Sequence, residues 1–121
     1  MSHSDIVLDF INGWNQLDWD RVESLLAPDV LYHNIPMEPI NGRAAAMGFI
    51  RGMDAKAVNW EVLSIAENGD KVLTERIDNF DLANGIHLSV PVMGTFEISD
   101  GLITAWRDYF DLATFTSQMA G

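Results

Sequence analysis

Apolar residues are spaced differently in the early part of the chain and in the rest. In the early part they recur three or four residues apart, which is the spacing of a helix face. This pattern predicts a first helix capped by Ser4, a short second helix capped by Asp18 and ending near Pro28, and an Ala- and Met-rich third helix over 43–53. A short strand is predicted over 30–35, between the second and third helices.

From residue 58 onward apolar and polar residues alternate, which predicts strands. The candidate strands are 58–66, 70–82, 86–98 and 102–111. Asn-Gly or Asp-Gly pairs separate them, and such pairs favour tight hairpins. Helices followed by strands predict an α+β fold of one domain, residues 1–121. We expect a strongly curved, mixed but mainly antiparallel sheet that forms a cone closed by three to four N-terminal helices.

Several polar residues share a strand face with apolar ones. Tyr32 and Asn34 are two apart, as are Arg76 and Asp78, and Asp108 lies between two aromatic residues of the same parity. If both later hairpins have three-residue loops, residues 76, 92 and 108 form one row across the sheet; two-residue loops give 76, 93 and 108 instead. Either register places Arg76 and Asp108 in the same row.

Charged residues two apart on a strand most often form a solvated face. Here the same face also carries large apolar residues, which argues against full exposure. These residues are Val72, Phe80, Val90, Val92, Trp106 and Phe110. The pattern therefore predicts an Asp78–Arg76–Asp108 cluster on an apolar floor, with room for a water molecule and a small substrate.

Composition narrows the classes of partner. The 121 residues contain 18 acidic and 7 basic side chains, for a net charge of −11. Such a chain repels nucleic acid and anionic membranes, so we expect neither as a partner. With no cysteine and three scattered histidines, no metal site and no cofactor are expected. The N-terminus lacks the basic start of a secretory signal, and we expect a cytoplasmic location.

Three motifs together resemble the limonene-1,2-epoxide hydrolase family, part of the ketosteroid-isomerase-like, SnoaL-like superfamily. They are Tyr32-His33-Asn34, Glu75-Arg76-Ile77-Asp78 and Trp106-Arg107-Asp108-Tyr109-Phe110-Asp111. The resemblance implies a cofactor-independent epoxide hydrolase. Such an enzyme would add water to a small, largely apolar epoxide in one step and yield a vicinal diol.

The resemblance also implies residue roles. Asp108 would be the base, Asp78 the acid and Arg76 the bridge between them, while Tyr32 and Asn34 would hold the water. Substrate would contact the inward apolar residues Phe80, Val90, Val92, Trp106 and Phe110. Phe80 stands where the family favours a smaller aliphatic residue.

Two other functions remain open on the same residues. One is a proton-transfer isomerase, which would not need the Tyr/Asn pair. The other is a non-catalytic ligand-binding module with a structural ion network. We also expect a homodimer, because the outer sheet face is unusually apolar at Met93, Ile103, Ala105 and Tyr109.

Overall fold

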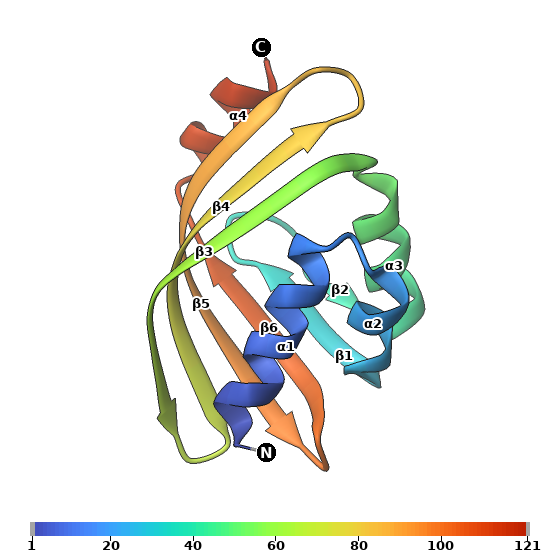
Figure 1. The fold of residues 1–121 in the computed structure, drawn as a ribbon, viewed down its shortest axis with the longest axis vertical. Coiled ribbons are helices and arrows are strands. Elements are labelled where there is room, and N and C mark those ends of the chain that lie inside the picture. Colours follow the sequence, from blue (N-terminus) through green and yellow to red (C-terminus); the bar gives the residue numbers. More distant parts are fainter. Residues whose placement is uncertain (1, 121) are drawn as a thin grey trace.

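The computed structural model describes residues 2–120 (Figure 1). The helices are α1 (His3–Asn15), α2 (Trp19–Ser24), α3 (Arg43–Gly52) and α4 (Leu112–Met119). The strands are β1 (Leu26–Asn34), β2 (Ile40–Asn41), β3 (Ala55–Asn68), β4 (Lys71–Leu82), β5 (His87–Ser99) and β6 (Leu102–Tyr109).

The strands form one curved sheet in the order β2-β1-β6-β5-β4-β3. Only the β1–β6 pair is parallel among the pairings described. Helices α1, α2 and α3 lie on the concave side of this sheet (Figure 1). The expected α+β fold with a mixed, mainly antiparallel sheet is confirmed. Three of the helices are N-terminal as expected, whereas α4 follows the last strand and was not predicted.

Local sequence explains most of the element boundaries. Ser2, rather than Ser4, caps α1: its hydroxyl accepts from the Asp5 amide, and the Asp5 carboxylate accepts from the Ser2 amide. Asp18 caps α2 as predicted. The first strand begins earlier than expected, at Leu26, and passes through Pro28. Proline fits there because the pairing with β6 is irregular between Leu26 and Leu31.

An aromatic cluster fills the space between α1 and the sheet. Phe10 and Trp14 of α1 are buried against Phe96 and Trp106 of the sheet. The rings of Phe10 and Trp106 meet edge to face with centroids 5.1 Å apart, and Phe96 stacks on Trp106 at 5.8 Å. Burying one such side chain stabilises the fold by roughly 2–3 kcal/mol. This packing holds α1 against the concave face of the sheet.

The predicted strand register is half right. Arg76 pairs with Val92 and Asp78 with Val90, as the three-residue loop before β5 requires. The predicted register of β5 with β6 is wrong, because Ser99 pairs with Leu102 across a two-residue turn. Both turn residues, Asp100 and Gly101, have positive φ, which is typical of a type I′ hairpin.

A β-bulge then shifts β6 once more. Glu97 pairs with Ala105, but Ile98 pairs with Ile103, so β6 carries one extra residue there. As a result Asp108 lies opposite Gly94 instead of Val92. The bulge also turns Ile103 into the core, where it is fully buried, so it does not belong to the outer apolar face as expected.

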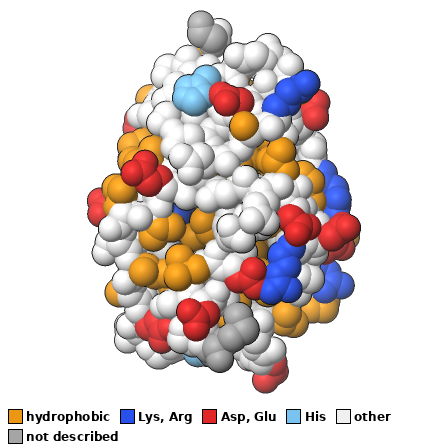
Figure 2. Space-filling model, in the orientation of Figure 1, with side chains coloured by type: hydrophobic (Ala, Val, Ile, Leu, Met, Phe, Trp, Pro, Cys, Tyr) orange, Lys and Arg blue, Asp and Glu red, His pale blue; other side chains and the backbone are white. Residues whose placement is uncertain are grey.

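Several charged side chains on the surface lie beside opposite charges. Figure 2 shows Lys and Arg side chains on the side where α2 and α3 lie, with acidic side chains next to them. Arg51 contacts Asp20 and Glu23 there, and Arg21 pairs with Asp9. Among residues 2–120 no helix is long and apolar enough to cross a membrane.

Candidate active site

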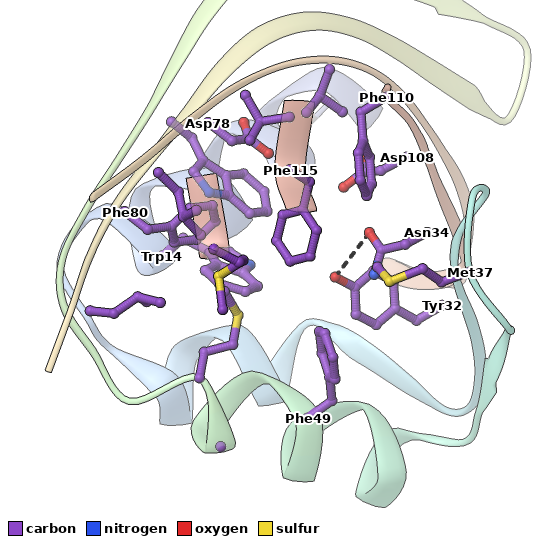
Figure 3. A pocket seen from close by; sticks show the side chains of 18 of the residues that line it. Trp14, Tyr32, Asn34, Met37, Phe49, Asp78, Phe80, Asp108, Phe110 and Phe115 are labelled. Carbon is purple, nitrogen blue, oxygen red and sulfur yellow. Dashed lines mark hydrogen bonds between the residues drawn. The ribbon is translucent and has the colours of Figure 1, made fainter. Parts of the chain in front are cut away.

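A cavity of about 530 Å³ opens between the concave face of the sheet, α3 and α4. Four of its polar side chains form one polar end (Figure 3), while Asn84 lines the cavity from the turn after β4. Tyr32, Asn34 and Asp108 come from the neighbouring strands β1 and β6, and Asp78 comes from β4. The remaining walls are mostly apolar. The cavity therefore combines a polar end with space for an apolar ligand.

Arg76 joins the two aspartates beneath this polar end. Its Nε and Nη2 donate to the two oxygens of Asp78, at 3.0 and 2.8 Å. Nη2 also donates to Asp108 Oδ2 at 3.0 Å. Arg76 is completely buried, and the two aspartates are 4% and 3% exposed. Arg76 thus binds Asp78 through two hydrogen bonds and Asp108 through one, instead of binding both carboxylates bidentately.

Aromatic rings cover the guanidinium of Arg76. Its central carbon lies 4.5 Å from the centre of the Trp60 ring and 5.8 Å from that of Phe96. Burial by itself would lower the pKa of Arg76, but the charges of Asp108 and Asp78 and their hydrogen bonds raise it overall. Arg76 therefore stays a cation and donates hydrogen bonds without giving up a proton.

The two carboxyl groups have different surroundings. Burial raises the pKa of Asp78 to about 6; the Asp108 charge acts in the same direction, and the hydrogen bonds and charge of Arg76 only partly oppose it. Asp108 Oδ1 is buried and has no hydrogen-bond partner among the described residues. Burial thus favours the protonated form of Asp78, while Asp108 keeps one carboxyl oxygen that Arg76 does not bind.

Tyr32 and Asn34 lie beside Asp108 in Figure 3. The Tyr32 hydroxyl donates to Asn34 Oδ1 at 3.4 Å, which is long for such a bond. Burial raises the pKa of Tyr32, and the nearby Asp108 charge adds to this effect. The hydroxyl consequently stays protonated, so that Tyr32 is a hydrogen-bond donor rather than a base.

Of the residues expected to contact substrate, four line the cavity and one does not. Phe80, Val90, Val92 and Phe110 are in its walls. Trp106 lies behind them and stacks on the Tyr32 ring, with centroids 3.9 Å apart and planes 9° from parallel. Trp106 is the direct partner of Tyr32 in the parallel pairing of β1 with β6, and it supports Tyr32 instead of lining the cavity.

Sequence reasoning missed much of the cavity wall. The missed apolar lining comes from helices, from loops and from β3, β4 and β5: Trp14, Met37, Phe49, Met53, Trp60, Leu82, Leu88, Phe115 and Met119. The signal for α4 was present, because Asp111 caps it and three apolar residues follow at helical spacing. Trp60 of β3 gives no such signal, because an inward-facing residue on an edge strand has the same sequence pattern as any other core position.

The histidines lie outside this cavity wall. His33 contacts the Met37 carbonyl, and His87 is exposed and pairs with Asp81. Within residues 2–120 no group of three or more His, Asp or Glu side chains is arranged to hold a metal ion.

Comparison with known proteins extends over the whole chain. Residues 1–121 match the model of the limonene-1,2-epoxide hydrolase catalytic domain. The chain is 36% identical over 105 residues to epoxide hydrolase EphG of Mycobacterium tuberculosis (strain ATCC 25618 / H37Rv), covering 85% of this chain and 69% of that protein.

Solved structures show the same architecture. The structure of an M. tuberculosis LEH-like epoxide hydrolase matches with a TM-score of 0.84 at 31% identity, over 96% of this chain and 87% of that one. An NTF2-like protein of unknown function from Burkholderia pseudomallei K96243 matches with a TM-score of 0.87 over both whole chains. Its identity is 18%, so it indicates the shared fold alone.

Proposed function

This chain belongs to the limonene-1,2-epoxide hydrolase family and is an epoxide hydrolase, and we propose that it opens its epoxide in one step with Asp108 as base and Asp78 as acid. One observation carries the proposal. Two buried carboxyls, linked by a single arginine, lie at the polar end of an otherwise apolar cavity.

In this mechanism Asp108 activates the attacking water. The Asp108 carboxylate, which lines the cavity, accepts a proton from the water as the water oxygen bonds to an epoxide carbon. Asn34 Oδ1 can accept a hydrogen bond from the second O–H of the water, and the Tyr32 hydroxyl can donate to the water oxygen in place of its long bond to Asn34. Three groups then orient one water molecule.

Asp78 supplies the other proton. As the carbon–oxygen bond of the epoxide breaks, the electron pair goes to the oxygen, and a protonated Asp78 donates its proton to it. Each carboxyl oxygen has a second lone-pair direction, so Asp78 can carry this proton while it still accepts from Arg76. The step ends with the diol, an ionised Asp78 and a protonated Asp108, and one proton must return to Asp78 before the next turnover.

The cavity walls support a small, largely apolar epoxide as substrate. Phe80, Val90, Val92 and Phe110 face the space above the carboxyls, and Phe49 closes it from α3. These side chains offer no hydrogen bonds, so orientation of the substrate relies on the epoxide oxygen at the polar end.

The test of the catalytic pair is the activity of Asp108→Asn and Asp78→Asn. Asparagine preserves size but cannot transfer the proton, so each variant should lose on the order of 10²-fold or more in kcat. Asp81→Asn, an exposed change on the same strand as Asp78, is the matched control and should keep its rate. A folded Asp78→Asn variant with a near-normal rate would remove that residue from the acid role.

Isotope labelling separates one-step opening from a covalent mechanism. A single turnover in H₂¹⁸O, with enzyme in excess, should place the label in the diol and leave Asp78 and Asp108 unlabelled. A covalent ester would instead deliver protein oxygen to the first diol and leave label in the carboxylate. Label in either aspartate would rule out direct attack by water.

We further propose a homodimer through the outer face of the sheet. Leu63, Met93 and Tyr109 are each about half exposed and border one depression of about 140 Å³. Large apolar side chains that are exposed next to one another favour association with a second copy.

A further inference from the structure

The row of the sheet that contains Asp108 has two other members. On the concave face, Thr74 of β4 lies opposite Gly94 of β5, and Gly94 lies opposite Asp108 of β6. Thr74 is 1% exposed. Neither Thr74 nor Gly94 lines the cavity, yet both contact the charged cluster beneath it.

Thr74 holds the third nitrogen of the Arg76 guanidinium. Arg76 Nη1 donates to Thr74 Oγ1 at 3.0 Å, and Thr74 Oγ1 lies 3.2 Å from the Gly94 carbonyl oxygen. A guanidinium can only donate, so the threonine hydroxyl accepts from Arg76 and directs its own hydrogen to Gly94. With Asp78 on Nε and Nη2, this bond leaves the guanidinium plane one orientation.

Gly94 leaves the space in which Arg76 and Asp108 meet. A Cβ atom at this position would lie 2.5 Å from Asp108 Oδ1, 3.2 Å from Thr74 Oγ1 and even closer to Arg76 Nη1. All three distances are shorter than ordinary van der Waals contact. Gly94 is not among the glycines with positive φ, so the backbone does not require glycine there. The remaining reason for a glycine at this position is the space that it leaves for Arg76 and Asp108.

We propose that Thr74 and Gly94 are positioning residues of the catalytic cluster: Thr74 orients Arg76, and Gly94 leaves the space that Arg76 Nη1 and Asp108 Oδ1 occupy. This inference rests on the proposed roles of Asp108 and Arg76. Small displacements of catalytic groups are expensive, since about 1 Å of misplacement can cost on the order of 10²-fold in rate. The two residues act on the rate through Arg76 and Asp108 without contacting substrate.

The test compares Thr74→Val, Thr74→Ser and Gly94→Ala with the wild-type chain. Thr74→Val keeps the shape but removes the acceptor for Nη1, so kcat should fall about tenfold or more while KM changes by less than about threefold. Thr74→Ser restores the hydroxyl and should recover most of the rate. Gly94→Ala should lower kcat on the order of 10²-fold. Thr95→Val, the same change on the opposite face of β5, should leave both constants unchanged.

The outcomes separate this inference from the proposed function. Wild-type kcat in a folded Thr74→Val variant, alongside an inactive Asp108→Asn variant, would overturn the positioning roles and leave the mechanism intact. An active Asp108→Asn variant would overturn the mechanism itself. A rise in KM without loss of kcat would also contradict the inference, because it would place Thr74 in substrate binding. The threonine pair keeps the test decisive if Gly94→Ala does not fold.

Discussion

Asp78 is a carboxyl on which burial and an ion pair act in opposite directions. Arg76 forms two hydrogen bonds to it, yet burial is the stronger effect and raises its pKa to about 6. One retained proton also reduces the charge of the Asp–Arg–Asp cluster from −1 to zero, which makes the cluster less costly to bury. The need to bury the cluster and the need for an acid near neutral pH therefore favour the same protonation state.

The pH dependence of the reaction should reflect this pKa. Because Asp78 must be protonated to act as acid, kcat/KM should fall as the pH rises through about 6, approaching tenfold per pH unit. A profile of kcat/KM from pH 5 to 9, corrected for uncatalysed opening of the epoxide, measures this decrease. A profile that stays flat from pH 5 to 8 would contradict the assignment of Asp78 as acid.

The same proton should affect folding stability. The pKa of Asp78 is raised in the folded chain, so this group contributes stability that is fully present below its unfolded pKa of about 3.8. That contribution is lost as the pH rises through about 6. Asp78→Asn, which is neutral at every pH, should remove this part of the pH dependence of the free energy of unfolding.

Arg76 serves the cluster by its shape as well as its charge. Lysine keeps the charge but has no planar fork, so Arg76→Lys cannot hold Asp78, Asp108 and Thr74 at once. We expect kcat to fall on the order of 10²-fold and the pH profile to move. Arg51→Lys, at an exposed ion pair, is the control and should match the wild type. A fully active Arg76→Lys variant with the wild-type pH profile would disprove the bridging role.

Helix α4 closes the cavity from the side, and its Phe115 packs, partly buried, against the core. None of its residues is fully buried, and it reaches the sheet through Phe115, Met119 and the side chain of Gln118. The Gln118 amide accepts from the Ser89 amide at 2.6 Å and donates to the Ser89 carbonyl at 2.9 Å. These two bonds resemble the backbone hydrogen bonds that a neighbouring strand would form with β5.

Removing that contact should loosen one wall of the cavity. Gln118→Ala should raise KM several-fold, because Phe115 and Met119 would no longer be held over the substrate, and should change kcat much less. The free energy of unfolding should fall by about 1–2 kcal/mol for two partly buried hydrogen bonds. Steady-state kinetics and denaturant unfolding measure both effects. Ser117→Ala, whose hydroxyl bonds only within α4, is the control; an unchanged KM in Gln118→Ala would show that α4 does not shape the binding site.

At the scale of the whole molecule, the two faces of the sheet differ in what they pack against. The concave face is covered by helices and encloses the cavity, whereas Leu63, Met93 and Tyr109 on the outer face stay about half exposed. The sheet therefore has one apolar surface that the described chain leaves open.

We expect a dimer in sedimentation experiments at micromolar concentration. Met93→Glu should yield a monomer, since it places a charge in the middle of the proposed interface. Ala44→Glu, the same change in charge on exposed α3, should leave the dimer intact. A wild-type chain that sediments only as a monomer would refute the proposal.

The sequence by itself determined the elements and much of the chemistry. Spacings of 3.6 and 2 residues, with turn pairs between the strands, identify the three early helices and the four long strands. Parity alone places Arg76 and Asp78 on one face, and the motifs around Tyr32, Asp78 and Asp108 are sufficient to identify the family. These properties depend on residues close together in the chain, so the amino-acid sequence alone is sufficient to predict them.

The tertiary structure alone decided how distant elements meet. The bulge in β6 moves Asp108 opposite Gly94 and buries Ile103, and the parallel pairing of β1 with β6 places Trp106 against Tyr32. No glycine or proline marks the extra residue, because a bulge forms where packing across strands favours it. The two-residue turn and the bulge each shift the pairing by one residue, so Asp108 keeps its expected face but has different neighbours. Only the packed sheet therefore determines which side chains surround Arg76 and Asp108.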